Sequence, residues 1–157
     1  MSPKVNYIPD GYHNVTPYLY IDGAAAAIEF YKKAFGATEV VRMPNPDGKI
    51  GHAEIKIGDS HVMLADQNEQ VKAYGPKHYG GAPGSLMVYV EDVDSVFQRA
   101  VDAGATVTRP VADQFYGDRN GGIEDPFGHH WFISTHFRDV SPEEMKQAME
   151  QMADASA

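Results

Sequence analysis

Hydrophobic and polar residues follow the same succession of patterns twice along the chain. Residues 18–40 (YLYIDGAAAAIEFYKKAFGATEV) begin with a strand-like alternation, continue with an acidic residue and a helical stretch, and include the tripeptide GAT at 36–38. Residues 87–108 (MVYVEDVDSVFQRAVDAGATVT) repeat this order with GAT at 104–106, so the strands are offset by 69 residues and the tripeptides by 68. A repeat with a fixed period indicates two copies of one structural unit.

Each copy contains a stretch whose apolar residues recur at helical spacing. This spacing is typical of an amphipathic helix that packs one face on a sheet. Gly36 and Gly104 follow these stretches, at the position where a residue in the left-handed conformation commonly ends a helix. The predicted buried faces are Ala24, Ala27, Ile28, Tyr31 and Phe35 in the first copy, and Val93, Val96, Phe97, Ala100 and Val101 in the second.

Three strand-like runs follow each predicted helix, with turns rich in Pro, Asp and Gly between them. Each half is therefore predicted to be a β-α-β-β-β module of an α+β fold. The runs are 38–43, 52–57 and 61–66 in the first half, and 106–110, 116–124 and 129–135 in the second. The predicted organisation is an N-terminal arm (1–13), the first module (14–66), a Gly- and Pro-rich linker loop (67–84), the second module (85–136) and a C-terminal tail (137–157).

The tail carries the signature of a separate helix. Ser141 is followed by Pro, Glu and Glu, which predicts a capping box with Ser at the N-cap and Pro at the first helical position. An apolar stripe follows at helical spacing, formed by Met145, Ala148, Met149 and Met152. We expect this stripe to cover the body of its own domain or of a second subunit.

The composition excludes several classes of function. The chain has 157 residues, no cysteine and a formal net charge of −9. Disulfides, thiolate nucleophiles and Cys-based zinc sites are absent, and the acidic charge argues against a nucleic-acid partner. Apolar runs are too short to span a bilayer, and the first fourteen residues lack the apolar core of a secretory signal. We therefore expect a cytoplasmic protein with no membrane partner.

Three stretches of the chain resemble one known family. They are IEFYKKAFGA after the first strand, GHAEIKIGDSHVMLAD in the middle and EDPFGHHWFIS at the end. In continuous register over about residues 14–136, they resemble the vicinal oxygen chelate superfamily of glyoxalases, bleomycin resistance proteins and extradiol dioxygenases. MVYVEDVDSVFQRAVDAGA and DQFYGDRNG are similar to its PhnB-like branch. The resemblance implies an eight-stranded, half-open barrel-like sheet with helices on its outer face and a ligand cavity on its concave face.

Metal-dependent members of this superfamily place four metal ligands in the cavity, one from the first and one from the last strand of each module. The resemblance and the two-residue period of a strand assign these positions here to Thr16, Met63, Ser85 and Phe132. These side chains do not provide the imidazole and carboxylate ligands that such sites need. We therefore expect neither a bound metal nor another cofactor.

The same alternation predicts which other side chains face the cavity. His52 and Glu54 are two residues apart on one strand, and we predict that they form a catalytic acid–base pair. Two alternatives stay open: a relocated metal site with His130, or polar residues on the solvated side of an open sheet. The predicted ligand-binding residues are Tyr18, Tyr20, Met63, Met87, Tyr89, Tyr116, Arg119, His130 and Phe132.

Arg119 is predicted to bind an anionic group of the ligand, the alternative being an ion pair with Asp118, Glu124 or Asp125. The favoured function is metal-independent binding of a small organic molecule by a homodimer, with sequestration of the molecule or catalysis by His52 and Glu54. One alternative is a metal-dependent lyase, isomerase or dioxygenase of the glyoxalase type. Another is an interaction module that works through its dimer surface and Met-striped tail.

Overall fold

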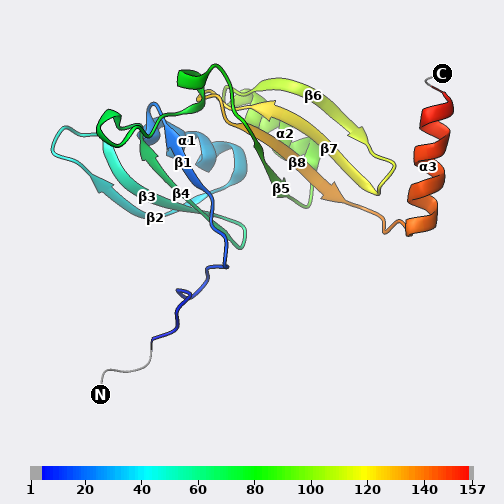
Figure 1. The fold of residues 1–157 in the computed structure, drawn as a ribbon, viewed down its shortest axis with the longest axis horizontal. Coiled ribbons are helices and arrows are strands. Elements are labelled where there is room, and N and C mark those ends of the chain that lie inside the picture. Colours follow the sequence, from blue (N-terminus) through cyan, green and yellow to red (C-terminus); the bar gives the residue numbers. More distant parts are fainter. Residues whose placement is uncertain (1–4, 156–157) are drawn as a thin grey trace.

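The computed structural model describes residues 5–155. Residues 1–4 of the predicted arm and 156–157 of the predicted tail lie outside the described residues. Eight strands form two four-stranded sheets (Figure 1), and within residues 5–155 no strand pair joins one sheet to the other. The α+β class is confirmed, with the predicted eight-stranded layer divided into two sheets that do not close into a barrel.

The two sheets have the same topology. The first module consists of β1 (Tyr18–Ile21), α1 (Ala24–Phe35), β2 (Thr38–Pro44), β3 (Ile50–Ile57) and β4 (Ser60–Asp66), in the sheet order β1-β4-β3-β2. The second consists of β5 (Ser85–Tyr89), α2 (Val93–Asp102), β6 (Thr106–Asp113), β7 (Asp118–Glu124) and β8 (His130–His136), in the order β5-β8-β7-β6. Two short 3-10 helices, η1 (Glu69–Val71) and η2 (Pro76–Tyr79), lie in the segment that connects the modules. The sequence repeat therefore encodes one β-α-β-β-β unit twice.

A carboxylate from β4 fixes the start of α1. The N-cap residue Gly23 has a left-handed conformation and offers no side chain to accept a hydrogen bond. Asp66 accepts instead, from the backbone N–H groups of Gly23 and Ala24 at 3.0 and 2.9 Å, and from that of Ile50 at 2.7 Å. A negative charge at this end also favours the helix dipole. The helix ends at Gly36, whose φ of 67° confirms the predicted left-handed cap.

Both helices lie on one side of the sheets, where α1 contacts α2 (Figure 1). The strand residues that face the helices are buried, among them Ile21, Ile55, Leu64, Trp131 and Ile133. The residues between them on the opposite faces are much more exposed: Tyr18 and Tyr20 are each 41% exposed, Met87 47% and Tyr89 61%. Period-2 alternation thus gives each module a helix-covered face and an uncovered face, called the open face below.

A buried carboxylate ties the two modules together. Asp125, in the turn before β8, is 2% exposed. It accepts hydrogen bonds from the Tyr31 hydroxyl of α1 at 2.6 Å and from Trp131 Nε1 at 3.1 Å. Its other oxygen accepts from the backbone N–H groups of Phe127 and His129, each at 3.0 Å. Burial, followed by the Asp125 charge and hydrogen bond, raises the pKa of Tyr31 well above its usual value, so this hydroxyl stays a donor.

The last helix, α3 (Pro142–Asp154), extends away from both sheets (Figure 1). The predicted capping box is confirmed, because Ser141 and Glu144 exchange side-chain-to-backbone hydrogen bonds. However, none of the described α3 residues is buried, so the expected packing on the body of its own domain is wrong for the single chain. None of the helices in residues 5–155 has the length and hydrophobicity needed to cross a lipid bilayer.

Candidate functional site

The open face of the first module carries a hydrogen-bonded chain of four side chains. The Tyr18 hydroxyl lies 2.8 Å from His52 Nδ1, and His52 Nε2 lies 3.0 Å from Glu54 Oε1. The other oxygen of Glu54 accepts a short hydrogen bond from the hydroxyl of Tyr12, which belongs to the segment before β1. The predicted pair is therefore assembled with a tyrosine at each end. Such a chain can pass a proton between Tyr18 and Glu54 through the imidazole.

Neighbouring side chains frame this network. Tyr12 stacks on His61 of β4 with ring centroids 3.9 Å apart, which lays the N-terminal segment across β3 and β4. His61 Nδ1 is buried and has no hydrogen-bond partner. Met63 of β4 is the register partner of both Tyr18 and Glu54, so its side chain lies between theirs on the open face. Burial, followed by the nearby Tyr20, raises the pKa of Tyr18, so its hydroxyl is held in the protonated form.

A second polar network, on the open face of the second module, is centred on Asp118. This carboxylate is 5% exposed and accepts hydrogen bonds from the hydroxyls of Tyr89 and Ser134, each at 3.1 Å. Asp118 also lies 2.6 Å from His136 Nδ1, while His136 Nε2 lies 3.0 Å from Asp139. Sequence reasoning predicted Tyr89 but missed His136, which ends the last strand on the same face as Phe132.

The contact between Asp118 and His136 favours the charged form of both side chains, as the shifts in their pKa values indicate. Burial alone would raise the pKa of Asp118, but hydrogen bonds from His136, Ser134 and Tyr89 outweigh it and lower the pKa. The hydrogen bond to Asp118, and then that to Asp139, raises the pKa of His136. This imidazole therefore holds its proton to higher pH than a free histidine does.

An arginine that sequence reasoning missed lies beside Phe132. Arg109 of β6 pairs in register with Gly122, which in turn pairs with Phe132, so both side chains share the open face. The guanidinium carbon of Arg109 is 5.1 Å from the centroid of the Phe132 ring. Arg109 also donates a short hydrogen bond to Asn120, whose amide donates to the Tyr116 hydroxyl at 2.8 Å. The predicted residues Tyr116 and Phe132 thus belong to one cluster with Arg109.

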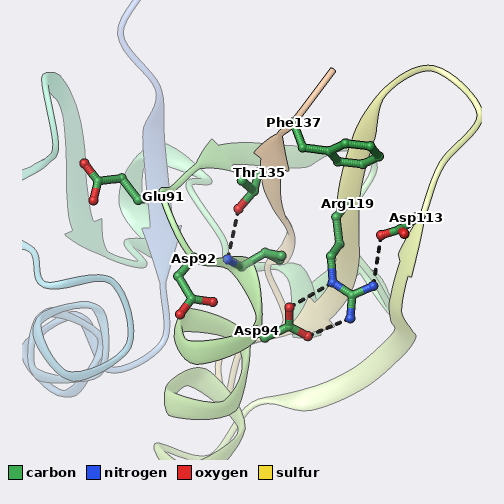
Figure 2. Close-up of a pocket in the computed structure, with 8 residues that line it drawn as sticks. Glu91, Asp92, Asp94, Asp113, Arg119, Thr135 and Phe137 are labelled. Carbon is green, nitrogen blue, oxygen red and sulfur yellow. Dashed lines mark hydrogen bonds and ion pairs between the residues drawn. The ribbon is translucent and has the colours of Figure 1, made fainter. Parts of the chain in front are cut away.

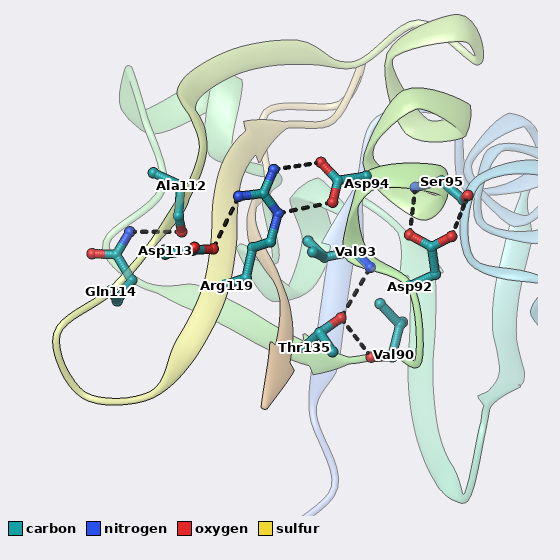
Figure 3. A network of polar contacts seen from close by, with 10 residues as sticks. All are labelled: Val90, Asp92, Val93, Asp94, Ser95, Ala112, Asp113, Gln114, Arg119 and Thr135. Carbon is teal, nitrogen blue, oxygen red and sulfur yellow. Dashed lines mark hydrogen bonds and ion pairs between the residues drawn. The ribbon is translucent and has the colours of Figure 1, made fainter. Parts of the chain in front are cut away.

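Arg119 lies on the opposite, helix-covered face. Figure 2 shows its guanidinium between Asp94, at the start of α2, and Asp113 of β6, beside a cavity of about 220 Å³. Two nitrogens donate to the Asp94 oxygens at 2.8 Å each, and a third donates to Asp113 at 3.0 Å, as Figure 3 also shows. These bonds raise the pKa of Arg119. The guanidinium has an ion-pairing role here, with partners other than the three considered from the sequence.

The histidines of EDPFGHHWFIS are directed to different places. His129 Nε2 lies 3.1 Å from the backbone carbonyl of Tyr20, and His130 Nε2 lies 2.9 Å from Glu124. His130 stands on the second sheet, whereas His52 and Glu54 stand on the first, so one chain does not assemble them as a relocated metal site. Within residues 5–155 no group of three or more His, Cys, Asp or Glu side chains is arranged to hold a metal ion.

Two of the four positions that the resemblance assigns to metal ligands, Met63 and Phe132, carry side chains unsuited to a metal. Met63 lies beside Tyr18 on the open face. Phe132 fills the corresponding place in the second module, under the Arg109 guanidinium. A thioether, an aromatic ring and a fixed positive charge are unsuited to a site for a divalent cation of the kind these folds bind. No step of a reaction is therefore assigned to a metal here.

A groove of about 1120 Å³ is lined by residues of both modules. Its lining comes from the segment before β1, from the turn between β3 and β4, from β5, and from helix-side residues such as Phe35 and Trp131. Met87, Tyr89 and His136 of the open face also line it. The predicted ligand-contacting residues of β5 therefore border this groove.

Comparisons with known proteins identify the family. The model of the Glyoxalase/Bleomycin resistance protein/Dioxygenase superfamily matches residues 12–133. An uncharacterized protein of Mycobacterium bovis, Mb0911c, is 46% identical over 143 residues, which are 89% of this chain and 94% of that protein.

Solved structures with the same fold include TioX from Micromonospora sp. ML1, with a TM-score of 0.62 and 26% identity over 82% of this chain and 100% of TioX. They also include a Bacillus cereus protein titled a putative 3-demethylubiquinone-9 3-methyltransferase, PhnB protein. Its TM-score is 0.61 at 19% identity, over 78% of this chain and 99% of that one. At this identity the second likeness supports the fold alone. The topology, the family model and the mycobacterial relative agree that this chain belongs to the glyoxalase/bleomycin resistance protein/dioxygenase superfamily.

Proposed function

We propose that this protein binds a small organic molecule on its open faces without the help of a metal ion. The observation that carries this proposal is the gathering of aromatic, thioether and hydrogen-bonding side chains on an uncovered surface. Tyr18, Tyr20, Met87 and Tyr89 remain 41–61% exposed there, and exposed apolar side chains that gather on one surface are typical of binding sites. The ligand would lie against these apolar groups and exchange hydrogen bonds with the two polar networks.

A homodimer is part of this proposal. Ligand pockets generally bury most of the surface of the molecule they hold. One chain leaves its open faces uncovered, so a second copy of the chain is the partner that would enclose the ligand. We propose that the protein acts in this form in the cytoplasm.

Catalysis, if the bound molecule reacts, would use the network of the first module. His52 lies between Tyr18 and Glu54, and both of its ring nitrogens are within hydrogen-bond distance of an oxygen. A ligand proton taken up by Glu54 could pass to His52 Nε2 while Nδ1 gives its proton to the Tyr18 oxygen and the Tyr18 hydroxyl gives its own proton to a basic atom of the ligand; the reverse sequence would return it. The reaction class supported by this arrangement is proton transfer on a small organic substrate. Sequestration would need only the apolar walls.

A thermal-shift screen of small metabolites and divalent metals tests the proposal. We expect organic molecules, and not metals, to raise the Tm of the full chain. Phe132→Ala and Tyr89→Ala should reduce the shift, whereas Tyr79→Ala, which changes an exposed tyrosine outside the site, should not. A Tm that rises with Zn, Ni, Mn or Fe alone would favour the metal-dependent alternative instead.

The interaction-module alternative rests on α3. Its apolar face, which includes Met145 and Met149, lines a surface groove with Val140 and Pro142, and none of the described α3 residues is fully buried. A short helix of 13 residues is marginally stable without such burial. Deleting the chain after Asp139 tests this alternative, because unchanged ligand binding together with an unchanged oligomeric state would count against it.

A further inference from the structure

The side chain of Arg109 is held in a fixed position on the open face of the second module. Its guanidinium lies over the Phe132 ring, with 5.1 Å between the guanidinium carbon and the ring centroid. Stacking of this kind orients the planar group and is itself favourable. A hydrogen bond from Arg109 to the Asn120 side chain fixes the guanidinium a second time.

The support beneath Arg109 is rigid. Asn120 is fully buried, and its amide nitrogen donates to the Tyr116 hydroxyl. This hydrogen bond orients the Asn120 side chain so that its amide oxygen faces the Arg109 guanidinium. Gly122 lies directly below, where a Cβ would stand 2.7 Å from Thr108 Oγ1 and 3.2 Å from the Phe132 ring. Only glycine therefore allows β6 and the ring to approach this closely. A buried amide, a half-buried aromatic ring and a missing Cβ leave Arg109 little freedom.

Arg109 also differs from three of the other four arginines in its charge environment, whereas Arg99, like Arg109, has no ion pair in the described part of the chain. Arg42, Arg119 and Arg138 each form ion pairs with carboxylates, at N–O distances between 2.8 and 3.5 Å. In the described part of the chain, no carboxylate lies within 4.0 Å of Arg109, and the residue is exposed. The formal net charge is −9, so carboxylates are abundant elsewhere on the protein. An arginine that is oriented but not neutralised offers its remaining N–H donors to an anion.

We propose that Arg109 recognises an anionic group of the ligand, and that the ligand is therefore a small organic anion bearing a carboxylate or a phosphonate. This inference rests on the function proposed above and assigns its ligand class. The anion would accept hydrogen bonds from the guanidinium. The apolar body of the ligand would extend along the sheet over Met87, which pairs in register with Phe132. Arg119 is already held by two carboxylates, so we assign this role to Arg109 in its place.

Binding of three simple probes to the uniformly 15N-labelled full chain tests this inference. The probes are benzoate, phenylphosphonate and the neutral benzyl alcohol, followed by NMR through the backbone and the Arg Nε–H resonances. We expect both anions to shift the Arg109 Nε–H and the Asn120 amide. Arg109→Met should weaken anion binding by about tenfold or more, since charge-assisted hydrogen bonds are lost. Arg109→Lys should restore part of the affinity, because it keeps the charge but not the planar group.

Arg138→Met is the control, since it removes an arginine that follows the second module and pairs with Glu144 of α3. It should leave the affinity for every probe unchanged, and Arg109→Met should leave the affinity for benzyl alcohol unchanged. Anions that bind Arg109→Met as tightly as the native chain, with shifts still on the open face, would overturn this inference alone. The inference would also be overturned if Arg109→Met changed only the mass measured by sedimentation, because Arg109 would then serve contact between copies. Failure of all three probes to shift any open-face resonance would overturn both this inference and the proposed function.

Discussion

Removal of the Asp125 carboxylate should destabilise the protein more than other single changes in its turn. The carboxylate accepts four hydrogen bonds while it is 2% exposed, and two of the donors, Tyr31 and Trp131, come from the packed core between the modules. In Asp125→Ala the Tyr31 hydroxyl and the Trp131 ring N–H would stay buried without an acceptor. An unsatisfied buried donor costs about 1–3 kcal/mol, so we expect a loss of about 3–5 kcal/mol in the free energy of unfolding.

Related variants should fall in a fixed order below Asp125→Ala. Asp125→Asn keeps a side-chain oxygen for the two backbone donors but places an amide N–H₂ group toward the Tyr31 and Trp131 donors. We therefore expect a loss of about 2 kcal/mol in the free energy of unfolding. Tyr31→Phe removes one donor and leaves the Asp125 carboxylate with three, so we expect the free energy of unfolding to fall by about 1–2 kcal/mol. The exposed Asp59 is the control, and Asp59→Ala should change stability little.

Urea unfolding followed by Trp131 fluorescence measures these differences, because the only tryptophan of the chain lies beside the carboxylate. The urea concentration at the midpoint should shift, while the slope of the unfolding free energy against urea concentration should stay the same if the transition remains two-state. The reasoning would be refuted if Asp125→Ala and Asp59→Ala had the same midpoint, or if Tyr31→Phe lost more stability than Asp125→Ala.

Three further predictions follow from other parts of the structure. His136 should titrate in NMR above the usual histidine pKa, because its bonds to Asp118 and Asp139 raise its pKa. Protonated His136 then contributes fully to stability below its unfolded-state pKa of about 6.5, and this contribution is lost as the pH rises through its folded-state pKa. The stability gap between the native chain and His136→Gln should therefore shrink with rising pH, and a constant gap would contradict it. Gly117→Ala should lower the Tm far more than Gly48→Ala, since both have positive φ but only at Gly117 would a Cβ overlap a backbone carbonyl, that of residue 138. Ser141→Ala should reduce helicity by circular dichroism, since a lost N-cap typically costs about 1 kcal/mol; unchanged helicity would count against the capping role.

Local patterns were sufficient to predict most of the architecture. The repeat gave both modules, and the helical spacing of Ala24, Ile28 and Tyr31 correctly identified a buried face of α1. Alternation likewise separated the buried Trp131 and Ile133 from Phe132 on the open face. These features depend on residues close together in the sequence, whose geometry is fixed by the period of a helix or a strand.

The features that local patterns did not reveal depend on strand register or on distant contacts. Arg119 was assigned to the ligand without applying alternation to its strand; it lies between Asp118 and Asn120 of the open face, so its own side chain turns toward α2. Arg109 reaches the open face because the register of β6 shifts between Val107 and Arg109, and unbroken alternation from Val107 would have turned it toward the helices. The bond between Tyr31 and Asp125 spans 94 residues, so no local pattern contains it. The uncovered stripe of α3 likewise depends on tertiary packing that spacing alone does not describe.

The metal content of the protein tests the central claim most directly. The full chain, purified without chelators, would be analysed by elemental mass spectrometry together with the His52→Ala variant. Since the resemblance assigns two of the family's metal positions to Met63 and Phe132, whose thioether and phenyl groups are unsuited to a catalytic divalent ion, we predict less than about 0.1 equivalent of Zn, Ni, Mn or Fe in both proteins. Stoichiometric metal in the native chain that is lost in His52→Ala would contradict metal-independent ligand binding.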